Sequence, residues 1–536
     1  MVNFLPSIDW PFLQDVYGWA GHQWLGWARS EVHVHSRSTK TLALNTRNIL
    51  EFWVDDTRYF GGDFYGFGRA AVTLHLSPGV HRIDVKLVGD VRAIGGLGEP
   101  TVDVQVKLHE TTEDLSLLYY GNEDVLMSDI VGGADGTLAS PYVTVAVRND
   151  AQRDVYVHGI EGMQNVCTKE LLVRAPIKVA PGQTRPIGFR LSCTSSFGER
   201  LLLGLNYTID GKSQARSLPF STRPDVHGDT SSSHKFTYIH PSGVVSYAIL
   251  RPPSKNGACG SRAADSVPIM IGLHGAATNA ANYDLLHSID AVHDLCAWLL
   301  VPQGTTPWSG DDWHSWGLAD VEAAVAAIPA WIEQVGWQGR SADPNRWLVT
   351  GHSNGGQGVY YLATHRPDKV IAAAALSGYS SIQNYVPYIS WRTADPGQMA
   401  IVQASLSSYR HDLLMDNVKG IPMILQHGSK DDNVPAYHSR LMDMRINKTG
   451  GSSAYFEIPG KNHDWDGVTT MPHLRDFYRE HLSQDSTVGC DAAPHLPNFS
   501  MVVADSGDMG PKNGVQVRQL ISAGEYDESC KARGAQ

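Results

Sequence analysis

The chain has 536 residues and a formal net charge of −12, and because it is too long for one hydrophobic core, roughly two to four domains are expected. The charge is spread along the sequence without a run or stripe of Lys and Arg, which argues against a role in nucleic-acid binding. No uncharged apolar stretch is long enough to cross a bilayer, since the longest candidate, Val370–Leu376, has the length of a buried strand.

Residues 1–113 are predicted to form a first β module. Ile49–Val54 and Ala71–Leu76 are apolar or alternate between apolar and polar side chains, and His81–Val88 alternates again. The stretch from Leu50 to Val88 resembles jelly-roll modules of the carbohydrate-binding or PA14-like kind. The resemblance implies a β fold but no particular ligand.

Residues 114–228 are predicted to form a second β module, an immunoglobulin-like sandwich, because short apolar strands recur at regular spacing. A polar segment rich in Ser and Thr, Val226–His234, follows and is predicted to be a linker. The expected strands are Tyr142–Arg148, Val155–Ile160, Leu171–Val179 and Thr184–Leu191.

The cysteines form no CxxC pair, which argues against a zinc site. Cys167 and Cys193 could form a disulfide within the second module, or the cysteines could be scattered buried thiols; the sequence leaves both alternatives open. The six cysteines are Cys167, Cys193, Cys259, Cys296, Cys490 and Cys530.

In residues 229–484 strands alternate with helical segments such as the Ala-rich Leu318–Val335, and this alternation predicts a mostly parallel, doubly wound sheet with helices on both faces. Residues 485–536 are predicted to be a C-terminal extension with a β-like stretch at Met501–Leu520. The expected strands of the sheet are Val245–Leu250, Pro268–Leu273, Trp298–Val301, Trp347–Thr350, Val370–Leu376, Pro422–Gln426 and Ala454–Ile458.

The pentapeptide Gly351-His352-Ser353-Asn354-Gly355 matches the pattern G-x-S-x-G. The strand Trp347–Thr350 precedes it, and a helix-compatible run, Gly356–His365, follows. A sharp turn from strand to helix needs small residues on both sides of an exposed serine. The context therefore favours Ser353 as a nucleophile over the alternative of an ordinary glycine-rich turn.

A serine nucleophile needs a base and an acid that orients the base. His463 lies just past Ala454–Ile458 and is the predicted base. Asp431 and Asp432 both follow Pro422–Gln426 and compete for the role of acid. The order Ser, Asp, His along the chain is the order that α/β hydrolases use.

Two backbone N–H groups are needed to stabilise the tetrahedral intermediate. The residue after the nucleophile, Asn354, is expected to provide one. The loop His274-Gly275-Ala276-Ala277 follows the strand Pro268–Leu273 and resembles the HG-type oxyanion loop of esterases and peptidases. Ala276 is the predicted second donor, and His274 itself is expected to be structural.

The segment from about His234 to His481 resembles the catalytic domain shared by prolyl-oligopeptidase-like (S9-type) peptidases and the esterases and polyester depolymerases close to them. The upstream β modules are similar to those of microbial, especially fungal, multidomain members. The family pattern H-G-x-x-D-x-x-V-P matches His427–Pro435 and implies that the acid is Asp431, which leaves Asp432 as a solvated loop charge.

The resemblance implies that the chain hydrolyses an ester, lactone or thioester through an acyl-enzyme on Ser353. Three alternatives stay open. One is an S9-like serine peptidase, and another is an acyltransferase or cyclase that uses the same triad. The third is a binding protein whose β modules hold a ligand beside a vestigial hydrolase domain. The triad cannot separate ester from amide cleavage.

Aromatic residues suggest where a substrate pocket and a cap would lie. Trp308, Trp313 and Trp316 follow the strand Trp298–Val301 and either line a pocket or pack the loop. The insertion Gly378–Gly420 is a candidate cap. It carries Tyr379, Tyr385, Tyr388 and Trp391. The candidate pocket residues are Trp313, Trp316, Tyr379 and Trp465.

No metal or organic cofactor is expected, because the triad and the oxyanion donors supply nucleophile, base and charge stabilisation. The expected partner is a small-molecule or peptide substrate. The β modules are predicted either to contact a glycan or polymer or to pack over the active-site rim and restrict access. No nucleic acid and no membrane span are expected.

The localisation is left open. The segment Met1–Trp10 lacks a basic region followed by an apolar one, so no signal peptide is predicted, although secreted relatives usually begin with one. Glycosylation-type triplets begin at Asn206, Asn447 and Asn498 and hint at secretion.

Overall fold

The structure is a computed structural model in which the chain divides into two units. The N-terminal unit extends to Thr230 and includes His234–Tyr247, and the C-terminal unit contains Ala248 and most of the residues that follow. Among the described residues, no helix has both the length and the apolar character that a membrane span needs. The described residues are 8–17, 23–47, 49, 51–61, 71–90, 104–118, 125–133, 135–162, 167–193, 200–209, 212–253, 266–276, 278–282, 292, 295–304, 313–385, 395–483 and 496–519.

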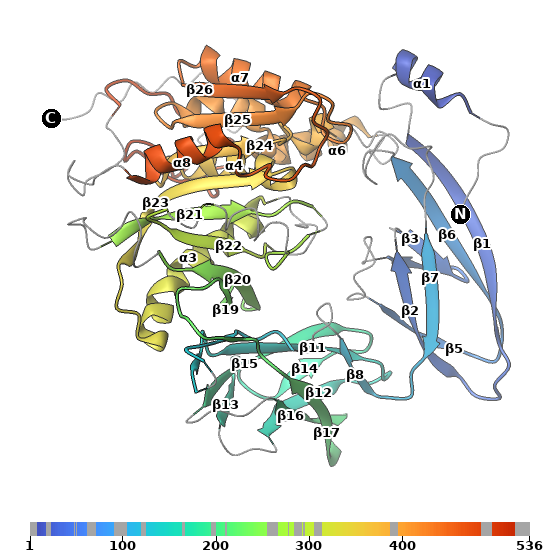
Figure 1. Cartoon of the computed structure of the whole chain (residues 1–536). Helices are drawn as coiled ribbons and strands as arrows, with labels where there is room; N and C mark the ends of the chain where they lie inside the picture. The colour runs from blue at the N-terminus through green and yellow to red at the C-terminus, as the bar shows by residue number, and fades with distance from the viewer. Residues whose placement is uncertain are drawn as a thin grey trace. The chain divides into compact units, whose positions relative to one another are not determined.

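The first β module consists of a four-stranded sheet, β1-β6-β3-β4, and a three-stranded sheet, β5-β2-β7 (Figure 1). Alternate side chains from both sheets, such as Phe52, Val85 and Leu44, form one buried cluster. The predicted β character of this segment is therefore confirmed. The strands are β1 (Gln23–Val34), β2 (Lys40–Arg47), β3 (Glu51–Val54), β4 (Thr57–Phe60), β5 (Val72–Leu76), β6 (Gly79–Asp90) and β7 (Gln105–Glu110).

A short helix, α1 (Trp10–Tyr17), precedes these strands, and the sequence analysis missed it. Asp9 directly precedes the helix, and its carboxylate accepts a hydrogen bond from the Phe12 N–H at 3.0 Å. This is an N-cap interaction, which satisfies a helix N–H group that has no partner within the helix. The expectation of strands throughout this segment is therefore wrong at its start.

The second β module contains the four-stranded sheets β13-β15-β11-β8 and β14-β12-β16-β17 and a small sheet, β10-β9-β18. Val145, Phe189 and Leu205 lie in its buried cluster. The strands are β8 (Leu115–Leu118), β9 (Ile130–Val131), β10 (Thr137–Leu138), β11 (Tyr142–Asn149), β12 (Val155–Gly162), β13 (Cys167–Leu171), β14 (Ile177–Val179), β15 (Thr184–Cys193), β16 (Leu201–Ile209), β17 (Lys212–Thr222) and β18 (Val226–His227).

Of the two alternatives for the cysteines, the disulfide Cys167–Cys193 is present and joins directly opposed positions of β13 and β15. Cys296 in the C-terminal unit is also a disulfide cysteine. Cys259, Cys490 and Cys530 lie outside the described residues.

The polar segment Val226–His234 is not a simple linker. Its first residues form β18, which pairs in parallel with β9. The His227 Nε2 atom lies 2.9 Å from a carboxylate oxygen of Asp129. The segment is therefore bound to the second β module, because its polar side chains and backbone find hydrogen-bond partners there, which composition alone does not reveal.

The strands of the C-terminal unit belong to an eight-stranded sheet in the order β19-β20-β22-β21-β23-β24-β25-β26. The pairs from β22 to β26 are all parallel, whereas β20 runs antiparallel to β22. The predicted mostly parallel sheet is confirmed. Its strands are β19 (His234–Ile239), β20 (Val245–Arg251), β21 (Ser266–Leu273), β22 (Trp298–Pro302), β23 (Ser341–His352), β24 (Val370–Leu376), β25 (Met423–Gly428) and β26 (Ser453–Ile458).

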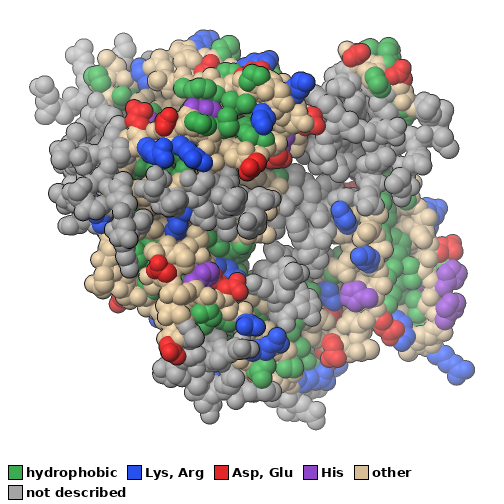
Figure 2. Space-filling model, in the orientation of Figure 1, with side chains coloured by type: hydrophobic (Ala, Val, Ile, Leu, Met, Phe, Trp, Pro, Cys, Tyr) green, Lys and Arg blue, Asp and Glu red, His purple; other side chains and the backbone are tan. Residues whose placement is uncertain are grey.

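Helices connect these strands and pack against the sheet; α4, for example, contacts β21, β23 and β24 (Figure 1). The surface drawn in Figure 2 carries Lys and Arg side chains interspersed with Asp and Glu, with no large patch of one sign. The helices are α3 (Ser315–Val335), α4 (Asn354–His365), α5 (Ile382–Tyr385), α6 (Pro396–Ser405), α7 (Tyr437–Lys448) and α8 (Pro472–Ser483), with 3₁₀ turns η3 (Ser407–Tyr409), η4 (His411–Leu413) and η5 (Met415–Val418).

The predicted β-like stretch Met501–Leu520 is wrong over its described residues, which contain an isolated bridge between Lys512 and Val515 but no strand. The segment binds to the C-terminal unit instead. The Gly510 N–H donates to the His365 carbonyl at 2.8 Å, and the Val502 N–H donates to Asn417 Oδ1 at 2.8 Å. These contacts satisfy the polar groups of the segment without a neighbouring strand.

Candidate functional site

The strand β23 turns sharply into helix α4 at Ser353, which has a positive φ of 59°. Such a conformation is strained for a residue other than glycine and is found mostly at functional sites. The turn depends on small neighbours. An added Cβ at Gly355 would lie 2.0 Å from the Leu273 carbonyl oxygen, and one at Gly356 would lie 2.5 Å from the Leu376 carbonyl oxygen. Only glycine fits at these two positions.

The structure brings Ser353, His463 and Asp431 together. His463 Nε2 lies 2.9 Å from Ser353 Oγ, and His463 Nδ1 lies 2.7 Å from Asp431 Oδ2. The three residues come from the ends of three strands, because Ser353 follows β23, Asp431 follows β25 and His463 follows β26. Parallel strands end at the same edge of a sheet, which explains how residues so far apart in sequence meet.

Asp431 is held as a carboxylate. Its side chain is fully buried, and Oδ1 accepts hydrogen bonds from the N–H groups of Asn433 and Val434 at 2.9 and 2.8 Å. Burial opposes ionisation, but the hydrogen bonds with His427 and His463 outweigh it and hold the pKa of Asp431 well below its ordinary value. Asp432, the competing candidate, is exposed on the loop.

Two histidines support these groups, and the sequence analysis gave neither of them a role. His427 Nε2 lies 3.1 Å from Asp431 Oδ2, and its Nδ1 lies 2.7 Å from Ser439 Oγ. His352 Nε2 donates to the backbone carbonyl of His463 at 2.9 Å. Burial and the neighbouring His463 lower the pKa of His352 to about 4, so its ring is neutral. The position of His427 at the start of the H-G-x-x-D segment could have indicated its role. No feature of the sequence indicated a role for His352.

The two predicted oxyanion donors lie on the segments that flank Ser353. Asn354 is the first residue of α4, where helix N–H groups point outward from the N-terminus. Its side-chain oxygen accepts a hydrogen bond from the Tyr379 hydroxyl at 2.7 Å. Ala276 follows Gly275, where an added Cβ would lie 3.7 Å from Ser353 Cβ. The predicted loop therefore runs directly beside the serine.

The predicted pocket residues differ in exposure. Trp313 is fully buried, and its Nε1 donates to the His274 carbonyl at 3.0 Å, so it packs the loop. Tyr379 is also buried and contacts the turn, whereas Trp316 is 57% exposed. Trp465 is partly exposed beside His463. Trp308, Tyr388 and Trp391 lie outside the described residues.

A cluster of buried histidines lies against helix α4. His411 Nε2 is 2.7 Å from Gln357 Oε1, and its ring centroid is 5.9 Å from that of His314. Burial lowers the pKa of His314 and of His365 to about 3 and lowers that of His411 well below 6.5. All three rings are therefore neutral at neutral pH and form part of the core that supports the serine turn.

Part of the chain is similar to a known protein family, and most of it is similar to one fungal protein. Residues 300–484 match the prolyl oligopeptidase family. An uncharacterized secreted protein of Arthroderma benhamiae is 38% identical over 509 residues, which are 95% of this chain and 53% of that protein. The chain thus spans about half the length of this relative.

Two solved structures are similar over about half of the chain. An S-formylglutathione hydrolase from Agrobacterium tumefaciens is 16% identical, with a TM-score of 0.35, over 47% of this chain and 95% of that one. Est1E from Butyrivibrio proteoclasticus is 17% identical, with a TM-score of 0.34, over 46% of this chain and 98% of that one. From the family match and the mostly parallel sheet, we conclude that residues 300–484 belong to a domain of the prolyl oligopeptidase family with the α/β-hydrolase fold.

Proposed function

We propose that the chain is a serine hydrolase that cleaves an ester, lactone or thioester through an acyl-enzyme on Ser353. The observation that carries the proposal is the hydrogen-bonded series Ser353, His463 and Asp431, with distances of 2.9 and 2.7 Å. Nucleophile, base and orienting acid within hydrogen-bond reach are the geometric signature of this chemistry.

In the first half-reaction, Ser353 Oγ attacks the carbonyl carbon while His463 Nε2 takes the hydroxyl proton. Asp431 holds the other ring nitrogen and stabilises the positive charge that develops on the imidazole. The N–H groups of Asn354 and Ala276 would bind the oxyanion. The bond to the leaving group then breaks, and His463 gives its proton to the departing oxygen or sulfur.

In the second half-reaction, a water molecule takes the place of the leaving group. His463 removes one water proton as the oxygen attacks the acyl carbon. Collapse of the second tetrahedral intermediate breaks the bond to Ser353 Oγ, which regains the proton from His463. Over the whole cycle the substrate and one water molecule give the free acid and the alcohol or thiol, and the enzyme is unchanged, so atoms and charges balance.

Peptide hydrolysis is the second candidate, and the match of residues 300–484 to the prolyl oligopeptidase family favours it. The same triad cleaves amides, so the choice rests on the substrate pocket and not on the catalytic groups. A panel of p-nitrophenyl esters and peptidyl p-nitroanilides separates the two. We expect the esters to be turned over with the higher kcat/KM.

A fluorophosphonate probe tests the catalytic proposal directly. We expect it to label Ser353 in the full chain, and Ser353→Ala to lose both labelling and turnover by several orders of magnitude. Ser38→Ala, which removes an exposed serine in the first β module, is the matched control and should behave as the parent chain does. Near-normal turnover in Ser353→Ala would contradict the assignment.

We also propose that the protein is secreted. The disulfide Cys167–Cys193 supports this, since such bridges persist in oxidising compartments. The relative from Arthroderma benhamiae is described as secreted. Detection of the protein only inside the producing cells, with Cys167 and Cys193 as free thiols, would contradict this proposal.

A further inference from the structure

The four-stranded sheet of the first β module has one face in the core and one outer face. Strand alternation sends Phe52 and Val85 inward, where they are buried. One row of opposed residues on the outer face consists of Trp27, Lys86, Glu51 and Phe60, taken across β1, β6, β3 and β4.

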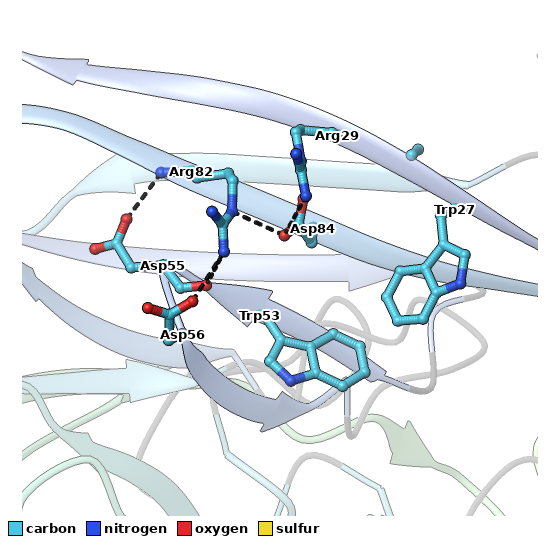
Figure 3. Close-up of a pocket in the computed structure, with 8 residues that line it drawn as sticks. Trp27, Arg29, Trp53, Asp55, Asp56, Arg82 and Asp84 are labelled. Carbon is cyan, nitrogen blue, oxygen red and sulfur yellow. Dashed lines mark hydrogen bonds and ion pairs between the residues drawn. The ribbon is translucent and has the colours of Figure 1, made fainter.

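The next row on the same face consists of Arg29, Asp84, Trp53 and Arg58. Four residues of these rows line an open pocket together with Arg82, Asp55 and Asp56 (Figure 3): Trp27, Arg29, Trp53 and Asp84. We call this surface the Trp27/Trp53 face.

The aromatic side chains of this face are presented to solvent. Trp27 is 63% exposed and Phe60 is 67% exposed. The ring centroids of Trp27 and Trp53 lie 5.1 Å apart with their planes tilted by 47°. Large aromatic groups gain free energy when they leave water, so an exposed group of them on a regular sheet indicates a binding surface. Neighbouring strands are about 4.8 Å apart, so four strands extend the aromatic positions over about 14 Å.

The charged side chains of the face are balanced. Arg29 pairs with Asp84 at 2.6 Å, and Arg82 bridges Asp84 and Asp56, each at 2.9 Å. On the neighbouring row, Glu51 pairs with both Arg58 and Lys86. Such a surface has no excess of either sign. A polyphosphate or an acidic polymer needs a concentrated positive patch, which the face does not provide.

The mixture of groups also argues against a protein partner. The core of a protein interface is depleted of charged residues and is surrounded by a polar rim. Here the charged rows run between the aromatic rings, since Lys86 and Glu51 separate Trp27 from Phe60 and Asp84 adjoins Trp53. Sugars suit this pattern, because each ring combines an apolar C–H face with hydroxyl groups at its edge.

We propose that the Trp27/Trp53 face binds a neutral polysaccharide. The indole rings stack on the sugar faces, while exposed donors and acceptors, above all Arg29 and Asp56, hydrogen-bond the hydroxyl groups. The length of the face corresponds to several sugar units and not to one. The inference stands apart from the proposed hydrolase activity, because the residues concerned all belong to the N-terminal unit.

Binding of the full chain to insoluble polysaccharides tests the proposal. The probes are the neutral polymers cellulose, chitin and β-1,3-glucan, with polygalacturonate and heparin as acidic polymers. We expect the parent chain to bind at least one neutral polymer and the double variant Trp27→Ala with Trp53→Ala to lose at least tenfold in affinity. Tyr437→Ala removes an aromatic residue that is 58% exposed in the C-terminal unit and is the matched control.

Turnover of a soluble p-nitrophenyl ester and the thermal unfolding midpoint should be unchanged in the double variant, which establishes that it is folded. Ser353→Ala should keep full polysaccharide binding, so failure of the catalytic proposal and failure of this one give different results. Binding to none of the neutral polymers, binding only to the acidic ones, or equal binding by the parent and the double variant would overturn the inference.

Discussion

Two histidines of the N-terminal unit and a cluster of histidines in the C-terminal unit have pKa values shifted in opposite directions. In the N-terminal unit, His81 and His227 pair with Asp55 and Asp129, and these hydrogen bonds raise the pKa of both rings. In the C-terminal unit, burial lowers the pKa of the rings against α4, among them His411. At His81 and His227 the hydrogen bond to a carboxylate outweighs burial, whereas at His411 burial dominates and lowers the pKa.

Two carboxylates, Asp84 in the N-terminal unit and Asp431 in the C-terminal unit, differ in how far water reaches their partners. Asp84 on the Trp27/Trp53 face pairs with Arg29, whose side chain is 67% exposed, so water competes for the pair. Asp431 is fully buried and bonds two histidines and two backbone N–H groups. We therefore expect the surface pair to contribute little to stability and the buried carboxylate to control the chemistry at Ser353.

The largest expected effect concerns the buried carboxylate. Asp431→Asn should lower kcat by about 10³- to 10⁴-fold, because the amide cannot hold the imidazole of His463 in the required tautomer. Asp432→Asn removes an exposed carboxylate of the same loop and should change kcat less than about twofold. Steady-state kinetics on a soluble ester measures both, and a larger loss in Asp432→Asn would contradict the assignment.

A buried ion pair in the second β module is expected to have the next largest effect. Asp150 bonds Arg148 at 2.5 and 3.1 Å, and both side chains are at most 3% exposed. Asp150→Ala leaves the Arg148 charge buried without its partner and should cost about 3–5 kcal/mol of unfolding free energy, measured by urea unfolding.

The double variant Arg148→Met with Asp150→Leu is the control for this experiment. It removes both charges and should recover most of the lost stability, since a buried ion pair and apolar side chains of similar volume are often equivalent. A double variant as unstable as Asp150→Ala would show that shape, and not an unpaired charge, causes the loss.

Acidification should weaken the C-terminal unit. Because burial lowers the pKa of His314, His365 and His411 from 6.5, the unfolded chain binds protons that the folded chain rejects as the pH falls through 6.5. Their stabilising contribution is complete above pH 6.5 and is lost below it. Acidification from pH 7.5 to 5.5 should lower the free energy of unfolding by up to about 4 kcal/mol through these three rings together. The decrease is measured as a shift in the urea midpoint.

The paired histidines oppose this trend. The pKa of His81 is raised by Asp55, so its contribution is present below pH 6.5 and is lost as the pH rises through the raised pKa. His81→Gln should therefore make the loss on acidification larger. A urea midpoint that does not change between pH 7.5 and 5.5, in the parent chain and in His81→Gln alike, would contradict the expectation that the buried rings stay neutral in the folded chain.

The smallest expected effect is at the exposed pair. Asp84→Asn should change the unfolding free energy far less than Asp150→Ala does, because Arg29 is largely exposed and regains water. Urea unfolding of the full chain measures the change. A loss as large as that expected for Asp150→Ala would remove the distinction between exposed and buried pairs.

The local pattern of apolar and polar residues was sufficient to predict most strands of the eight-stranded sheet. The strand Val370–Leu376 was predicted with the bounds that the structure has, since a short apolar run between turns has few other solutions. The turn at Ser353 was predicted from the G-x-S-x-G pattern, because close backbone contacts require its glycines and so leave a recognisable pattern in the sequence. The helix α1 and the strand β18 were missed, since a side-chain cap and pairing with a distant strand leave little trace in a local pattern.

The sequence by itself determined the α/β alternation, the β modules and the motifs that carry Ser353, His463 and the two candidate acids, because these features depend on residue type and short-range spacing. Only the tertiary structure decided which carboxylate meets His463, that His427 and His352 brace the site, and that Trp313 is buried while Trp27 faces solvent. The physical reason is that hydrogen-bond partners and solvent exposure are set by segments distant in the chain, which meet only when the strands align.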